Sequence, residues 1–141
     1  MKIYISGVMQ GSIKGHGIQG QGYRQAISEA VRTRNPDVEI YDPFLAFPNS
    51  VEFDDQLAKQ ALFTMADEAA SADVLIAYLP EASMGTALEM TRAYDNGKAI
   101  ISISRLEKNW FIRAVSAKLF FSLEDFIVWV RQTNLSELLT T

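Results

Sequence analysis

The chain has 141 residues and a net charge of −4, so it is long enough for one sizeable core and lacks the basic surface of a protein that binds nucleic acid or membrane. It contains no cysteine, which excludes disulfides, thiolate metal sites and a cysteine nucleophile and suits a reducing cytoplasm. The start, MKIYISG, leads directly into a strand, and no apolar run approaches the ~18 residues of a membrane span. We therefore expect a single cytoplasmic domain over residues 1–141, with no signal peptide.

Strands and helices alternate in the predicted secondary structure. The run at 73–79 is apolar throughout, as in a strand covered on both faces, and the segment 51–72 places Leu57, Ala61, Met65 and Ala69 on one helical face. The segments 7–22 and 43–50 are predicted to be loops. In chain order, the predicted elements are strand 2–6, helix 23–34, strand 38–42, helix 51–72, strand 73–79, helix 83–97, strand 98–104, helix 109–116, strand 118–121 and a helix over 122–132.

This alternation predicts the fold class. Strands joined through helices form parallel βαβ units, so we expect an α/β flavodoxin-like or Rossmann-like three-layer sandwich with a five-stranded parallel sheet. In such sheets, ligands bind beyond the carboxyl ends of the strands, where the strand order reverses. The loops 7–22, 42–50 and 79–85 should therefore meet at a ligand site.

The stretch LPEASMGTALEM, residues 79–90, is the most informative part of this predicted site. Its residues 82–87 are small apart from Met84, and Gly85 is among those that let a ligand approach the backbone. Ser83 is the predicted N-cap, and free N–H groups at a helix start favour an anion. Glu89 follows in the second helical turn. Spacing alone favours an exposed glutamate that pairs with Arg92.

Together with YISG near the start, the stretch ADVLIAYLPEASMGTALEMTRAYDNGK resembles the nucleoside 2-deoxyribosyltransferase family. The similarity runs from about residue 2 to about residue 104 and is greatest for the branch of 2′-deoxynucleoside 5′-phosphate N-hydrolases. This resemblance implies an enzyme that cleaves an N-glycosidic bond in a nucleoside or nucleoside 5′-monophosphate, by hydrolysis or transfer. It implies a homodimer or larger oligomer and no metal or organic cofactor.

The resemblance also implies roles for individual residues. Glu89 matches the carboxylate that attacks the anomeric carbon, and Tyr4 matches a tyrosine that lies beside it. The matches that would bind substrate are Gly7 and Gly11 around the sugar and phosphate, Ser83 on the 5′-phosphate, and Asn109 near the phosphate of a neighbouring subunit.

One position departs from the family. Met65 stands where the family carries an aspartate, which favours the alternative of an inactive nucleotide-binding module. Glu68 lies near the same helical face and is a possible substitute for that aspartate. Asp42, which follows the second strand, is a spare carboxylate that would contact substrate or activate water, or is simply a turn residue before Pro43. An unrelated flavin-binding domain of the same fold is a third possibility, which the scarcity of hydroxyl residues in the first loop disfavours.

Overall fold

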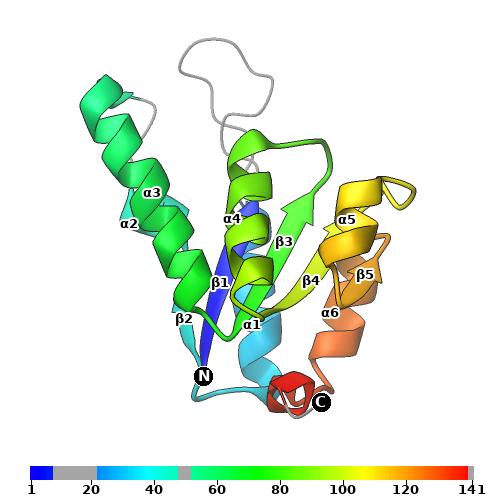
Figure 1. The fold of residues 1–141 in the computed structure, drawn as a ribbon. Coiled ribbons are helices and arrows are strands. Elements are labelled where there is room, and N and C mark those ends of the chain that lie inside the picture. The colour runs from blue at the N-terminus through cyan, green and yellow to red at the C-terminus, as the bar shows by residue number, and fades with distance from the viewer. Residues whose placement is uncertain (8–21, 48–51, 140–141) are drawn as a thin grey trace.

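A computed structural model describes residues 1–7, 22–47 and 52–139 of the chain (Figure 1). Its strands are β1 (Lys2–Gly7), β2 (Glu39–Tyr41), β3 (Val74–Leu79), β4 (Ala99–Ser104) and β5 (Lys118–Phe120). Its α-helices are α1 (Gly22–Arg34), α2 (Pro43–Ala46), α3 (Asp55–Ser71), α4 (Met84–Asp95), α5 (Trp110–Val115) and α6 (Leu123–Val130), and a 3₁₀ helix, η2, spans Leu135–Leu139.

The strands form one parallel sheet in the order β2-β1-β3-β4-β5. This is the flavodoxin-like order. Helices α1 and α6 cover one face of the sheet, whereas α3, α4 and α5 cover the other (Figure 1). The five-stranded parallel α/β sandwich predicted from the sequence is therefore confirmed.

The two faces of β1 carry different side chains because successive residues of a strand point in opposite directions. Ile3 and Ile5 belong to the core under α1 and α6, together with Ile27 and Val31 of α1. Tyr4 lies in the other core, under α3 and α4, and Ser6 shares its direction along the strand. A hydroxyl-bearing face therefore lies between the central strand and α4.

Three details differ from the prediction. Residues 43–46 form the one-turn helix α2 instead of a loop, because the Asp42 side chain accepts a hydrogen bond from the Phe44 N–H and Pro43 starts the turn. The helix predicted over 51–72 begins at Asp55, after the N-cap Asp54. Leu57 is 46% exposed, because the first turns of α3 extend beyond the sheet (Figure 1).

The carboxyl ends of β1 and β3 mark the point where the strand order reverses. Gly7 ends β1 opposite Tyr78 of β3, and the turn after β3 leads to α4 at the same edge. Gly11 and most of the predicted loop 7–22 lie outside the described residues. Ligands bind at this edge in folds of this kind, so the fold points to the surroundings of β1 and α4.

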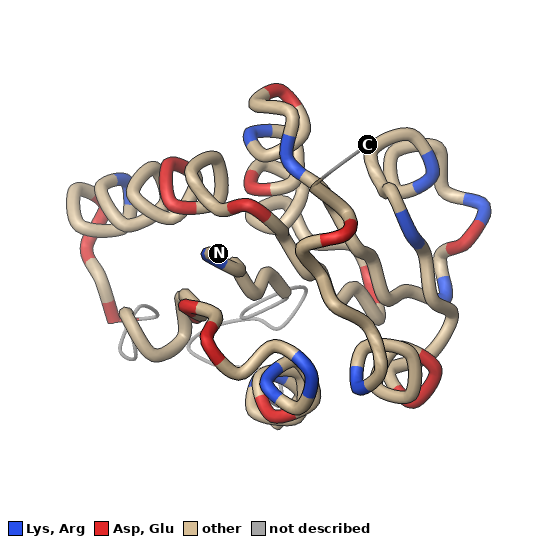
Figure 2. Tube along the Cα trace, turned by 90° about the horizontal axis from the view of Figure 1, so that it is seen from below, with Lys and Arg blue, Asp and Glu red and all other residues tan. Residues whose placement is uncertain are grey.

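Charged residues of both signs are spread over the described chain (Figure 2). Several elements carry both signs, and neither sign is confined to one side of the view. None of the described helices is both long enough and apolar enough to cross a bilayer.

A side chain at Gly7 would make a close contact with Tyr23. A Cβ at this position would lie 2.2 Å from the Tyr23 hydroxyl oxygen, and the Tyr23 ring packs against Tyr78 with centroids 4.5 Å apart. We expect Gly7→Ala to lower the free energy of unfolding by about 1–3 kcal/mol, measured by urea denaturation. Gly22→Ala is the control, since a Cβ there meets nothing within 4 Å and should leave stability unchanged or slightly higher. A Gly7→Ala protein as stable as the wild type would contradict this reading of the contact.

Candidate functional site

The centre of the candidate site is the carboxylate of Glu89, a residue that is only 6% exposed. The Tyr4 hydroxyl donates a hydrogen bond to Oε2, and the Ser6 hydroxyl donates to Oε1 at 2.6 Å. Both donors are themselves fully buried. Each carboxylate oxygen keeps a further acceptor position, because an ionised carboxylate has about four such positions in total.

Helix α4 directs Glu89 toward β1. Its buried residues are Thr86, Glu89, Met90 and Ala93, a spacing of three and four that marks one face of a helix. Arg92 lies on another side of the helix and pairs with Asp67 of α3 at 3.2 Å. The exposed Glu89–Arg92 pair that spacing alone favours is therefore absent, and Glu89 faces the sheet.

Two opposing effects act on the ionisation of Glu89. Burial raises its pKa above the ordinary value, whereas the hydrogen bonds from Ser6 and Tyr4 and the charge of Arg24 lower it. Burial also raises the pKa of Tyr4, and the neighbouring Glu89 carboxylate adds to the rise. Tyr4 consequently keeps its proton and acts as a hydrogen-bond donor to the carboxylate. Tyr23, close to the same strand end, has its pKa raised to about 12, mainly by burial.

A buried ion pair lies at the end of β1, beside this centre. The Arg24 Nη1 group of α1 donates to Asp42 Oδ1 at 3.0 Å and to the carbonyl of Ile5 at 3.2 Å, and Nη2 donates to the carbonyl of Gly7 at 3.2 Å. The same Asp42 oxygen caps α2 through Phe44. Asp42 is therefore held by the protein at the carboxyl end of β2, where its role toward a substrate stays a prediction.

Three of the residues predicted to bind substrate lie at helix N-termini, Ser83 and Gly85 on α4 and Asn109 on α5. Ser83 is the N-cap, and its hydroxyl accepts a hydrogen bond from the Thr86 N–H at 3.2 Å. Gly85 has open space beside it, since a Cβ built there meets no atom within 4 Å. Asn109 is the exposed N-cap of α5, and its side chain accepts from the Ile112 N–H at 3.2 Å. Both caps leave free N–H groups at helix starts.

An apolar residue, Met65, stands where the family that the sequence resembles carries an aspartate. Met65 of α3 is half-buried and packs against the core that contains Tyr4 and Tyr41. Glu68 forms an ion pair with Lys2, at the start of β1 and therefore at the opposite end of the strand from Ser6. The Glu68 carboxylate is thus already paired, and its role in place of that aspartate stays a prediction.

Three polar residues of this region were not predicted from the sequence. Ser6 could have been found by strand alternation, since it must share the face of Tyr4. Arg24 carried a signal too, because it lies three residues before Ile27 on the apolar side of α1, where a charge needs a partner. Thr86 is 1% exposed, and its hydroxyl has no hydrogen-bond partner among the described residues.

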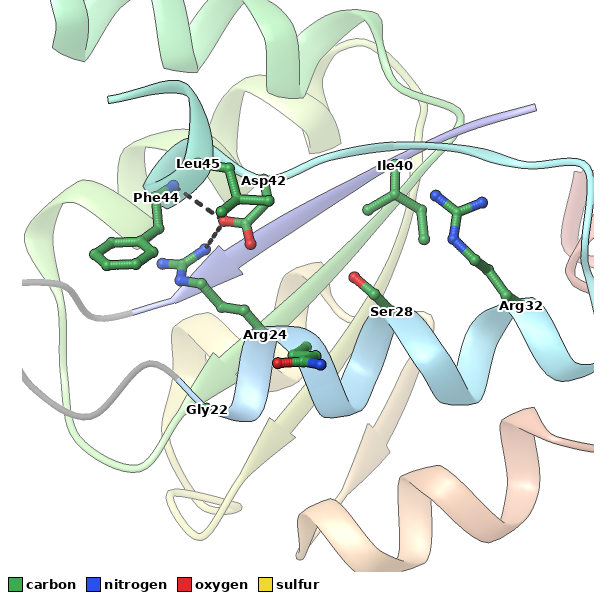
Figure 3. Close-up of a pocket in the computed structure, with 9 residues that line it drawn as sticks. Gly22, Arg24, Ser28, Arg32, Ile40, Asp42, Phe44 and Leu45 are labelled. Carbon is green, nitrogen blue, oxygen red and sulfur yellow. Dashed lines mark hydrogen bonds and ion pairs between the residues drawn. The ribbon is translucent and has the colours of Figure 1, made fainter. Parts of the chain in front are cut away.

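A cavity of about 540 Å³ lies between α1 and the segment that joins β2 to α2 (Figure 3). Arg24, Asp42 and Phe44 lie at one end of it, Arg32 and Ile40 lie at the other, and Ser28 lies between them. Glu89, Tyr4 and Ser6 do not line it. We place the candidate site at Glu89 because the hydrogen-bonded carboxylate, unlike this cavity, lies where the strand order reverses. The described residues contain no cluster of three or more side chains suited to hold a metal ion.

No protein-family model matches the chain, and no curated protein matches it. Solved structures do. The 2-deoxyribosyltransferase of the psychrotolerant bacterium Bacillus psychrosaccharolyticus is 18% identical, with a TM-score of 0.68 over 98% of this chain and 96% of that one. A conserved protein from Enterococcus faecalis V583 is also 18% identical, with a TM-score of 0.63 over 94% of this chain and 98% of that one. These similarities show a shared fold over nearly the whole chain.

The Thr86 hydroxyl is buried without a hydrogen-bond partner in the part of the chain that the structure describes. A buried hydroxyl without a partner costs about 1–3 kcal/mol, whereas an apolar group of the same shape does not carry that cost. We therefore expect Thr86→Val to raise the free energy of unfolding, measured by urea denaturation without ligand. Thr86→Ser is the control, because it keeps the hydroxyl, loses a buried methyl and should be less stable than the wild type. A Thr86→Val protein less stable than the wild type would show that the hydroxyl has a partner in solution.

Proposed function

We propose that this protein cleaves or transfers at the N-glycosidic bond of a nucleoside or nucleoside 5′-monophosphate, with Glu89 as the nucleophile. The observation that carries the proposal is the buried Glu89 carboxylate, held by Tyr4 and Ser6 where the strand order reverses. The fold shared with a 2-deoxyribosyltransferase and the sequence resemblance support it.

The geometry suits attack on an anomeric carbon. Cleavage of an N-glycosidic bond passes through a sugar with oxocarbenium character, which a nearby carboxylate stabilises. A Glu89 oxygen would form a bond to C1′ while the C1′–N bond breaks, and the electron pair would leave with the base, which is then protonated. Water or a second base would release the sugar from the ester and restore the carboxylate. Tyr4 and Ser6 would hold the carboxylate in place as charge develops on the sugar.

Glu89→Gln provides the direct test. The substitution nearly keeps the size of the side chain but removes the charge and the nucleophile, so base release should fall by at least the 10²–10³ that loss of a transition-state stabilising group typically costs. Binding should persist. The measurement is chromatography of free base after incubation with a panel of nucleosides and their 5′-monophosphates.

Asp95→Asn is the matched control, because it neutralises an exposed carboxylate at the end of the same helix. It should release base at the wild-type rate. Base release at the wild-type rate by Glu89→Gln would refute the proposed mechanism, since residues 84–94 of α4 contain no other carboxylate.

A nucleotide-binding module without turnover is the second candidate. The observation that favours it is the apolar Met65 at the position of the family aspartate. The neighbouring carboxylates are already paired, Asp42 with Arg24 and Glu68 with Lys2. A wild-type protein that binds members of the panel but releases no base would decide for the module.

The finer part of the proposal concerns the 5′-phosphate. The N-terminus of α4 offers free N–H groups beside the cap Ser83 and the open space at Gly85, a setting that favours an anion. We propose that a 5′-monophosphate binds more tightly than its nucleoside, with Gly7 and Gly11 close to the sugar and Asn109 contributing across a homo-oligomer. These assignments follow from the resemblance.

Ser83→Ala should therefore weaken binding of the 5′-monophosphate more than binding of the nucleoside, as measured by calorimetry. Loss of an N-cap costs about 1 kcal/mol of stability wherever it occurs, so a matched cap is the control. Ser122→Ala removes the N-cap of α6, where the Ser122 hydroxyl accepts from Asp125 at 3.1 Å. It should lower stability without changing either affinity. Equal loss of both affinities in Ser83→Ala would contradict the phosphate assignment.

A further inference from the structure

The ion pair between Arg24 and Asp42 is unusually well buried for this protein. Its side chains are 3% and 8% exposed, whereas those of the Arg92–Asp67 pair on the surface are 37% and 75% exposed. A buried ion pair is weak evidence for stability, since removing two charges from water offsets much of their attraction. The position of this pair beside the candidate site therefore calls for another explanation.

Arg24 holds the segment of β1 that contacts Glu89. Its guanidinium donates to the carbonyls of Ile5 and Gly7, the two residues on either side of Ser6. Ser6 in turn donates its hydroxyl to Glu89 at 2.6 Å. The backbone on both sides of the donor is thus tied to one rigid, planar cation.

Arg24 is also the cation that acts on Glu89 within the described part of the chain. The groups around Glu89 are the Tyr4 and Ser6 hydroxyls of β1 and the Tyr41 phenol of β2, which stacks on Tyr4 at 5.5 Å. Helix α1 adds the Tyr23 phenol and Arg24 itself. The hydroxyl groups are neutral. Asp42 lies 3.0 Å from Arg24, so its negative charge opposes that of the guanidinium.

We propose that Arg24 and Asp42 are positioning residues for Glu89. Arg24 holds the Ser6 segment in place and supplies the positive charge that favours the ionised carboxylate, and Asp42 sets how much of that charge Glu89 experiences. Both residues would act through Glu89 and the Ser6 segment, without contact to the reacting atoms. The inference rests on the proposed function, because a nucleophilic carboxylate has to be ionised, and base release is therefore lost as the pH falls through the pKa of Glu89.

The loss of base release at low pH forms the acid limb of the pH–activity profile. Substitutions of Arg24 and of Asp42 should move this acid limb in opposite directions. Asp42→Asn exposes the full charge of Arg24, so the pKa of Glu89 falls and the limb moves to lower pH. Arg24→Gln removes the cation and leaves the negative charge of Asp42, so the limb moves to higher pH. Coulomb's law fixes the direction of each shift, and its size depends on the distance between Glu89 and the removed charge. In the double variant the limb should return toward its wild-type position.

The experiment measures the pH dependence of base release and, without substrate, the titration of Glu89 by carbon-13 NMR of labelled glutamate side chains. Glu89→Gln identifies the resonance. Arg92→Gln is the control, because it removes an exposed cation of α4 that pairs with Asp67 and should shift neither profile. If Arg24→Gln fails to fold around its unpaired aspartate, Asp42→Asn and the double variant still decide the sign.

Opposite shifts in the two single variants, in both measurements, would support the proposal. No shift, or shifts in the same direction, would overturn it. If the pair were merely structural, both single variants would lose activity and the titration of Glu89 would stay where it is in the wild type. A wild type without base release would refute the proposed function separately, since the NMR titration needs no turnover.

Discussion

The burial of the Glu89 carboxylate is the constraint on which the rest of the site depends. A buried charge is costly unless hydrogen-bond donors surround it. Here each carboxylate oxygen accepts a hydrogen bond from a hydroxyl group of β1. Tyr4 and Ser6 can both reach it only because they lie two residues apart on one face of a central strand. The register of β1 and the packing of α4 on the sheet are therefore tied to one side chain.

This arrangement couples the ionisation of Glu89 to several layers of the fold. Burial between α4 and β1 raises its pKa. The hydrogen bonds from the two hydroxyls of β1 lower it, and so does the charge of the Arg24 guanidinium on α1. The backbone carbonyls of Ile5 and Gly7 and the carboxylate of Asp42 in turn hold Arg24. A change in any of these elements would alter the charge state of the carboxylate, so the chemistry depends on the ends of β1 and β2 as much as on α4.

The sequence predicted the architecture well and the local details less well. Hydrophobic period and turn residues are local signals, which is why all five strands and the alternating helices were found. Leu57 was placed on one helical face with Ala61, yet it is 46% exposed, because the first turns of α3 extend past the sheet (Figure 1). The short helix α2 was missed because one turn has no period to detect, and for its cap, Asp42, the sequence offered a substrate carboxylate or a turn residue.

The sequence alone predicted the α/β alternation and the edge of the sheet where a ligand would bind. Through a family resemblance it also gave Glu89, Tyr4 and Ser83 as candidate site residues. The tertiary structure alone decided that Glu89 is buried, that Ser6 is its second donor, and that Arg24 and Asp42 lie beside it. The contacts of Tyr4 and Ser6 with Glu89 span 85 and 83 residues of the chain. The hydroxyl of a strand residue or the guanidinium of a helix residue carries no local signal about its partner, because the packing of elements distant in sequence determines which polar groups meet.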